Sequence, residues 1–426
     1  MLSRRRFVQS SSLALAGTAC GVAQGSDDGA GAQSLPPSIA ALTPMRDQAT
    51  PISVDERRAR LEKARRLMTE NRIDALMLTG GTSMVYFTGM QWGLSERMTT
   101  VVIPARGEAF IVTPKFEEER TLEQARTGPL GAGTKVLTWE EDESPGRLVA
   151  QGLRNAGIAS GSLGVEETVR FVFSDMVAQA APAIRITSGT PISAGCRMVK
   201  DQHELALMRL ASQVTLKAYE AAWKALQDGM TQNQFADLVA RAHSQLGFTG
   251  GAGVQVGEYS ALPHGSVQPQ VIREGTILLI DGGCKVEGYS SDLSRTFVLG
   301  KATDRMKSVF DLELKAQSAA LAAAGPGIEC QAVDAAARKV IEDGGFGPGY
   351  KFFTHRVGHG MGMDGHEWPY LVKGNTLKLE PGMTFSDEPG IYIPGEFGVR
   401  LEDDMVITEN GAELFTPQST SLEAPF

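Results

Sequence analysis

Two segments in the second half of the sequence share one arrangement of acids and turn residues. Asp281 is followed by two glycines and, eleven residues later, by Asp292. Glu388 is followed by Pro-Gly and, fourteen residues later, by Glu402. On a β-hairpin, such spacing can bring two acids side by side on neighbouring strands. Two such hairpins facing one point would gather four carboxylates, which strongly limits how this half can fold.

Four clustered carboxylates need positive charge nearby, because buried like charges raise one another's pKa steeply. One such acid alone would be interpreted as a solvated turn residue. The histidines decide between that interpretation and a metal-binding cluster. The chain has six, and four of them lie in glycine-rich or proline-adjacent loops near these acids: His264, His355, His359 and His366. The other two, His203 and His243, lie in helical patterns without a partner motif and are interpreted as ordinary helix residues.

His359 is the strongest candidate metal ligand, because the glycines on both sides of it let the backbone approach another group closely. Imidazole suits Mn, Co, Zn or Fe, and carboxylates favour harder ions such as Mn. One histidine with four carboxylates therefore describes a mixed site for two divalent ions roughly 3.5–4 Å apart.

The bulk properties exclude some functions. A chain of 426 residues predicts two domains or more. Its net charge of -9, with no basic block beyond the first few residues, disfavours nucleic acid as a partner. The four cysteines, at positions 20, 196, 284 and 330, form no CxxC pair, and we expect no disulfide.

The N-terminus has the features of an export signal. Arginines 4–6 precede a short apolar run over 13–19, which favours a twin-arginine leader and a periplasmic location. The run is far shorter than the roughly 20 residues that span a bilayer, so no transmembrane span is expected. Cys20 is a minor candidate for a lipid anchor. We assign residues 1–33 to the signal peptide and leader, and 34–53 to a flexible linker.

Residues 54–198 are predicted to form an α/β domain. An amphipathic pattern predicts a helix over 54–71, followed by a buried strand over 75–78. Arg106-Gly107 lies between two strand-like runs and predicts a hairpin. Because no strand is followed by a G-x-G-x-x-G loop or a P-loop, we assign this domain no nucleotide.

Residues 199–426 are predicted to form a second domain of the α+β class. A helical pattern runs from 202 to 226, and a capping box over 231–234 opens another helix. Strand-like segments follow from 253 to 299. Two further helices are expected over 305–323 and 331–342, and the chain then returns to strands and turns.

The second domain resembles the pita-bread metallopeptidases, which comprise methionine aminopeptidase, aminopeptidase P and prolidase. Asp281, Asp292, His359, Glu388 and Glu402 match the five metal ligands of that family in order and local context. The matching segments are IDGGCKVEGYSSDLSRTFVLG, HRVGHGMGMDGHEWP, SDEPGIYIPGEFGVRLEDD and SALPHG. With the α/β domain, which resembles the N-terminal domain of creatinase and prolidase, the resemblance covers nearly everything after residue 50.

The resemblance implies a role for each residue. Asp292 and Glu402 would bridge two ions, Mn or Co by family expectation and Zn as another option. Asp281 would complete one site, and His359 with Glu388 the other. Glu388 would also accept a proton from the attacking water. His264 and His366 would orient the substrate and stabilise the developing oxyanion and the leaving nitrogen.

Two further residues point to one branch of the family. His355 and Arg400 match substrate-binding positions of aminopeptidase P and prolidase, which implies a peptide substrate with proline second. Dipeptidase and aminopeptidase activity both remain open, and the resemblance implies a homodimer or homotetramer. The creatinase branch lacks most of the acids retained here. A catalytically silent peptide-binding protein on the same fold is the other alternative, and Arg400 could instead be a surface residue paired with Glu402 or Asp403.

Overall fold

The computed structural model describes residues 34–426, so the expected export signal lies outside the described residues. The expectation of a flexible linker is wrong for residues 37–48, which form α1 (Pro37–Ala40) and η1 (Arg46–Gln48). Ile39 is fully buried, and the Met45 amide donates a hydrogen bond of 2.9 Å to the Leu246 carbonyl. Burial of these apolar side chains orders a segment whose composition alone indicated a tether. In the described range, no helix is long and apolar enough to cross a bilayer.

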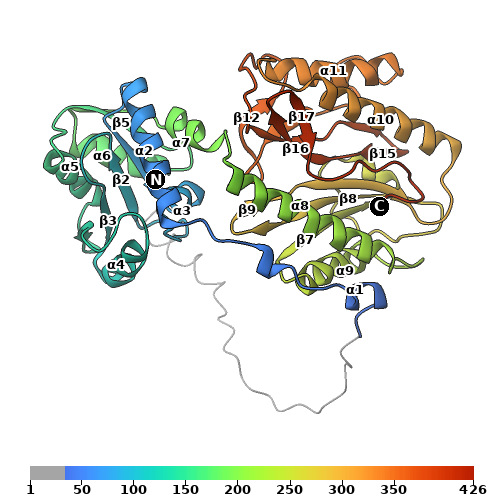
Figure 1. Cartoon of the computed structure of the whole chain (residues 1–426), viewed down its shortest axis with the longest axis horizontal. Coiled ribbons are helices and arrows are strands. Elements are labelled where there is room, and N and C mark those ends of the chain that lie inside the picture. Colours follow the sequence, from blue (N-terminus) through green and yellow to red (C-terminus); the bar gives the residue numbers. More distant parts are fainter. Residues whose placement is uncertain (1–33) are drawn as a thin grey trace, which may run out of the picture. The chain divides into compact units, whose positions relative to one another are not determined.

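The first domain is built on a six-stranded mixed sheet in the order β4-β3-β2-β1-β5-β6 (Figure 1). Its strands are β1 (Ala75–Thr79), β2 (Thr100–Pro104), β3 (Phe110–Pro114), β4 (Lys135–Trp139), β5 (Gly161–Val165) and β6 (Ile184–Ser188). Its helices are α2 (Val54–Asn71), α3 (Thr82–Thr88), η2 (Lys115–Glu117), α4 (Glu118–Thr127), α5 (Pro145–Asn155), α6 (Phe171–Ala180) and α7 (Thr190–Arg197). The α/β class predicted from the sequence is confirmed.

Local sequence signals account for the start of this domain. Ser53 caps α2 through a reciprocal capping box with Glu56, and the helix spans the predicted range. The predicted hairpin forms between β2 and β3, which pair antiparallel with Val101 opposite Ile111. β1 pairs with β2 on one side and β5 on the other. It is buried along its whole length, and Ala75 and Met77 belong to an apolar core that includes Val149 of α5 and Val177 of α6.

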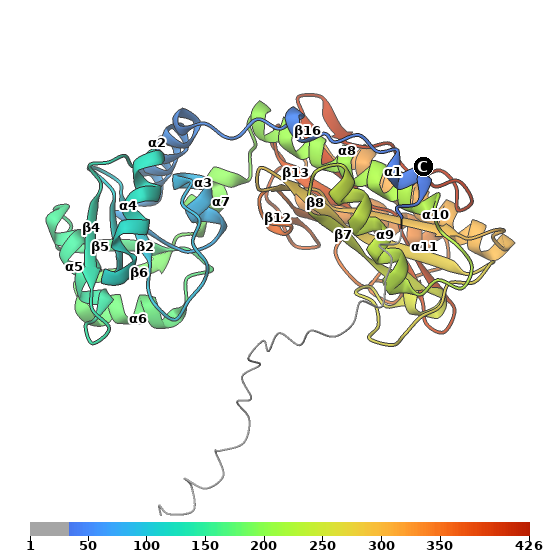
Figure 2. The same ribbon diagram turned by 90° about the horizontal axis from the view of Figure 1, so that it is seen from below.

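The second domain places its sheets between two pairs of helices (Figures 1 and 2). α8 (Gln202–Trp223) and α9 (Gln232–Gln245) pack against β8 and β7, and α10 (Asp304–Ala323) packs against α11 (Cys330–Asp343) and β15. Capping boxes at Asp201 and Thr231 start α8 and α9, and the Thr303 hydroxyl caps α10.

Three sheets make up the rest of this domain. Their orders are β10-β8-β7, with β9 beside β8; β12-β11-β13-β16-β17; and the hairpin β14-β15. The elements are β7 (Gly250–Val256), η3 (Gly257–Ala261), β8 (Ile277–Val286), β9 (Tyr289–Ser290), β10 (Leu293–Val298), β11 (Gly358–Gly360), β12 (Glu367–Leu371), β13 (Thr384–Asp387), β14 (Gly390–Ile393), β15 (Phe397–Arg400), β16 (Asp403–Thr408) and β17 (Gly411–Leu414). An apolar core that includes Phe310, Phe353 and Phe385 joins α10 and α11 to these strands.

Candidate metal centre and active site

The two acid-bearing segments form the predicted hairpins. Asp281 lies on β8 opposite Ser294 of β10, and Asp292 directly precedes β10. In the second hairpin, β14 and β15 pair antiparallel. Glu388 directly follows β13 and lies two residues before β14, and Glu402 lies two residues after β15 and directly precedes β16. An isolated bridge between Ser294 and Glu402 joins the two hairpins. This bridge brings together the ends of the hairpins that carry the acids.

Five side chains meet at this junction, and we call Asp281, Asp292, His359, Glu388 and Glu402 the acid–histidine cluster. Candidate ligand atoms lie within 4.8 Å of one another in each of two groups that share Glu402. One group contains Asp281, Asp292 and Glu402, and the other contains His359, Glu388 and Glu402. Two adjacent groups with a shared carboxylate are the arrangement that a pair of bridged cations requires.

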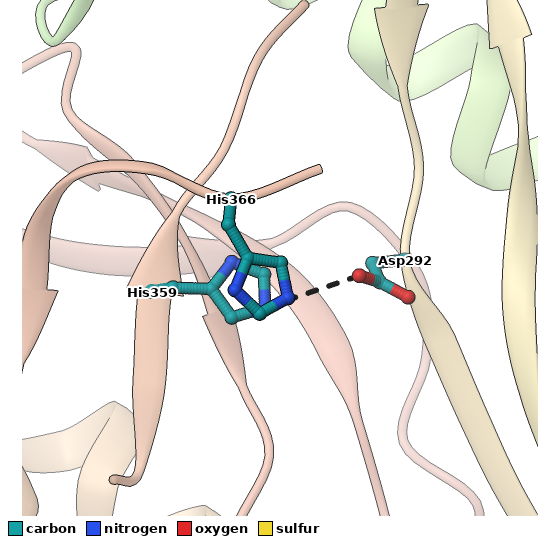
Figure 3. Close-up of side chains that lie close together, drawn as sticks. All are labelled: Asp292, His359 and His366. Carbon is teal, nitrogen blue, oxygen red and sulfur yellow. Dashed lines mark ion pairs between the residues drawn. The ribbon is translucent and has the colours of Figure 1, made fainter. Parts of the chain in front are cut away.

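His359 reaches the acids from β11. Its Nε2 lies 3.1 Å from Glu388 Oε1 and 3.9 Å from Asp292 Oδ2, and its ring stacks on that of His366 at 3.7 Å (Figure 3). Glycine is required beside it, since a Cβ on Gly358 would lie 2.0 Å from the Ser386 carbonyl oxygen. The close backbone approach expected from these glycines is confirmed.

Burial and mutual repulsion perturb the acids. Burial, with the charge of Asp281 adding to it, raises the pKa of Asp292 to about 7. Burial and the charge of Asp292 raise the pKa of Glu402 well above its ordinary value. Burial has the same effect on Glu388, but the hydrogen bond and charge of His359 outweigh it and lower the pKa of Glu388. Burial opposes protonation of His359, yet its bond to Glu388 raises the pKa of His359 to about 9.

The raised pKa values of Asp292 and Glu402 show that their ionised forms are unfavourable without positive charge nearby. Bound cations would supply that charge. The donor set, four carboxylates and one imidazole, matches divalent ions of intermediate hardness. Neighbouring hydroxyls fix the orientation of two carboxylates: Ser294 Oγ donates to Glu402 at 2.6 Å, and Ser386 Oγ donates to Glu388 at 3.1 Å. Such supporting hydrogen bonds are typical of metal ligands. The residues present therefore fit a pair of divalent metal ions.

Removal of divalent ions should make stability fall as the pH rises. A raised carboxyl pKa means that the folded state binds more protons than the unfolded state, so its stability is lost as the group ionises. For Asp292 this window runs from about pH 4 to about pH 7, and the expected loss of unfolding free energy is about 2–4 kcal/mol. His359, whose folded pKa is raised, extends the decline towards pH 9. The lowered pKa of Glu388 acts only below about pH 4.5.

Urea unfolding in EDTA and in Mn²⁺, at a series of pH values, measures this effect. With Mn²⁺ the decline should disappear, because bound cations favour the ionised carboxylates. Asp292→Asn is the matched variant, and it should flatten the curve obtained in EDTA between about pH 4 and pH 7. A Mn²⁺ stabilisation of equal size at acidic and at neutral pH would contradict the assignment.

A hydrogen-bonded wall lies beside the cluster. His355 Nε2 lies 2.7 Å from the Tyr392 hydroxyl, which accepts a hydrogen bond of 2.9 Å from Arg400. Arg400 also forms an ion pair of 2.7 Å with Asp281. It is buried, so the alternative of a surface arginine is wrong, although Glu402 does lie 4.0 Å from it. Burial lowers the pKa of His355, which favours the neutral ring.

Sequence reasoning missed Tyr392, the centre of this wall. Its signal was the period of two along β14, which places it on the same face as Gly390, two residues after the ligand candidate Glu388. All nine predicted site residues line one cavity of about 150 Å³, together with Pro263 and Arg356. His264 contributes from the loop after η3, and His366 from the turn before β12.

The histidines and cysteines outside the cavity have ordinary environments. His203 bonds to Glu56 and to the Thr50 carbonyl, and His243 is buried on α9 with a bond to the Val239 carbonyl. Cys284, beside the cluster, is buried and its thiol contacts the Ala211 carbonyl at 3.4 Å. Burial raises the pKa of its thiol, so Cys284 behaves as a small apolar residue.

Comparison with known proteins agrees with this geometry. Residues 206–409 match metallopeptidase family M24, and residues 60–199 match the creatinase/prolidase N-terminal domain. A probable dipeptidase PepE of Mycobacterium tuberculosis is 33% identical over 359 residues, covering 83% of this chain and 92% of the relative. An Xaa-Pro dipeptidase of Lactobacillus delbrueckii is 32% identical over 372 residues, covering 85% and 98%.

A solved structure extends the likeness to three dimensions. The crystal structure of dipeptidase PepE from Mycobacterium ulcerans superposes with a TM-score of 0.82 and 32% identity, covering 88% of this chain and all of that one. An α/β domain followed by a pita-bread domain with an acid–histidine cluster defines a class of hydrolases. Within that class, this chain belongs to metallopeptidase family M24.

Proposed function

We propose that this protein hydrolyses the bond between an N-terminal residue and a following proline, with dipeptides as its main substrates. The observation that carries the proposal is the single cavity lined by the acid–histidine cluster and by His264, His355, His366 and Arg400. Two relatives that this chain matches over nearly their whole length carry the name Xaa-Pro dipeptidase. A cavity of about 150 Å³ is also smaller than the roughly 300–1,000 Å³ of typical ligand pockets, which favours short peptides.

Different side chains of the cavity have different roles in the proposed reaction. When bound, two divalent ions would supply Lewis acidity and a water of lowered pKa. Glu388, whose position is fixed by a hydrogen bond from Ser386, would accept the proton of the attacking water. The wall of His355, Tyr392 and Arg400 receives the proline. A peptide-bound proline nitrogen carries no hydrogen, so it must gain a proton to leave.

His366 is well placed for that last step. Its ring stacks on His359, and burial together with the nearby charge of His359 lowers the pKa of His366. A neutral imidazole at neutral pH can relay a proton to the leaving nitrogen or donate a hydrogen bond to the substrate. His264, on the opposite loop, completes the positioning of the scissile bond.

The direct test is metal-dependent cleavage by the purified full chain. After removal of metal with EDTA, Mn²⁺, Co²⁺ or Zn²⁺ is added in turn, and release of alanine is followed from Ala-Pro, Ala-Pro-Gly and Ala-Ala. We expect Ala-Pro to be cleaved fastest and Ala-Ala at least tenfold more slowly. Faster cleavage of Ala-Pro-Gly would identify an aminopeptidase. No cleavage of any peptide with two ions bound per chain would favour the silent binding protein.

The same proposal includes finer features of the protein. The carboxylate-rich donor set supports Mn²⁺ or Co²⁺ over softer ions. The arginines and apolar run near the N-terminus support export to the periplasm, which cell fractionation would test. A homodimer or homotetramer is proposed from the family resemblance, and light scattering of the purified protein would test it.

A further inference from the structure

Arg356 occupies a place in the cavity that the proposed reaction does not use. It lies in the segment between α11 and β11, next to His355 and three residues before His359, and its side chain lines the cavity. The guanidinium carbon lies 4.1 Å from the centroid of the Tyr370 ring on β12. This cation–π contact holds the charged group in one place without neutralising it.

The two arginines of the cavity differ in how their charges are engaged. Arg400 is paired with Asp281 at 2.7 Å, and it donates further bonds to Ser294 Oγ at 3.0 Å and to the Pro263 carbonyl at 3.1 Å. Within residues 34–426, the Arg356 guanidinium forms no ion pair and no side-chain hydrogen bond. The N–H donors of the Arg356 guanidinium are therefore available to bind a ligand.

Among the described residues, the carboxylates of the acid–histidine cluster do not pair with Arg356. Glu388 bonds to His359 and Ser386, Glu402 bonds to Ser294, and Asp281 is held by Arg400. A half-buried guanidinium fixed over an aromatic ring presents a planar fork of donors that suits a carboxylate. The missing partner is therefore an anion brought by the ligand.

We propose that Arg356 binds a carboxylate of the peptide substrate and thereby sets which peptides are cleaved. This inference rests on the proposed function. A peptide offers two such groups: the C-terminal carboxylate of Xaa-Pro, and the side chain of an acidic residue before the proline. Arg356 lies against Tyr370, whereas Arg400 contacts Tyr392 and Asp281. The two sources make different demands on the substrate, so matched peptides separate them.

Arg356→Gln, assayed with two matched pairs of peptides, tests the proposal. The first pair is Leu-Pro against Leu-Pro-amide, which differ in the C-terminal charge. The second is Glu-Pro-amide against Gln-Pro-amide, which differ in the side-chain charge. Loss of a charged hydrogen bond should lower kcat/KM by roughly 10- to 150-fold for the charged member of one pair. The uncharged member of that pair should change less than threefold.

A shift confined to the first pair identifies the C-terminal carboxylate as the ligand of Arg356, and a shift confined to the second identifies an acidic first residue. Arg356→Lys, which keeps the charge, should recover part of the loss. Lys373→Gln removes an exposed charge just after β12 and is the matched control, with no selective effect expected. An equal loss on both members of both pairs would overturn the proposal. A wild-type enzyme that cleaves none of these peptides would instead count against the proposed function.

Discussion

Glu388→Gln is expected to lower kcat by about 10²–10⁴-fold, because glutamine keeps the shape of glutamate but cannot accept a proton. Glu388 lies 3.1 Å from His359 Nε2 and accepts a hydrogen bond from Ser386. An amide oxygen can retain the bond from Ser386, so the fold should be preserved. The loss should fall on kcat more than on KM, because the proton is transferred in the transition state.

Because Glu388 is also a candidate metal ligand, the bound metal must be measured together with the rate. A lower rate could otherwise reflect lost metal. Steady-state hydrolysis of Ala-Pro is followed in Mn²⁺, with bound metal determined by elemental analysis of the same sample. Glu380→Gln changes an exposed glutamate nearby and should leave both quantities at the wild-type level. Two bound ions with more than a tenth of the wild-type kcat would exclude Glu388 as the proton acceptor. A variant that has lost its metal assigns Glu388 as a ligand and leaves its second role to be tested at saturating Mn²⁺.

Local sequence signals predicted the elements of this fold well. The helical patterns that start at 54 and 202 match the starts of α2 and α8, and the capping box at Thr231 marks where α9 begins. The acid–turn–acid spacing predicted two hairpins with their acids at one end, and β8–β10 and β14–β15 have that form. These features depend on residues close in sequence, whose preferences are largely set by backbone sterics and nearby hydrogen bonds.

Contacts between distant segments could not be predicted in the same way. The bridge between Ser294 and Glu402 and the ion pair between Asp281 and Arg400 each join residues more than a hundred positions apart. No local pattern distinguishes a buried arginine from a surface one on a strand, so the pairing of Arg400 stayed open. The segment 37–48 was misjudged for the same reason, because its burial depends on α8 and α9.

Arg295→Met is expected to lower the free energy of unfolding by about 3–5 kcal/mol, because it leaves a buried carboxylate without its partner. Arg295 and Asp403 are both fully buried, with their charged atoms 2.7 Å apart. Arg295 also donates to the Glu402 carbonyl at 2.8 Å and to the Pro417 carbonyl at 3.0 Å. The substitution should therefore disturb the backbone at Glu402, between β15 and β16, as well as reduce stability, and metal affinity should fall with it.

A second substitution separates the unpaired charge from the lost packing. Asp403→Asn on the Arg295→Met background removes the isolated charge, and it should recover part of the lost free energy although the single Asp403→Asn change is itself destabilising. Urea unfolding of the four proteins gives the coupling energy between the two sites. Arg305→Met breaks the exposed pair with Glu396 and is the control, for which little change is expected. If the double variant were no more stable than Arg295→Met alone, the energy would lie in the carbonyl contacts of Arg295. Arg295 would then stabilise the fold chiefly through its hydrogen bonds to the carbonyls of Glu402 and Pro417.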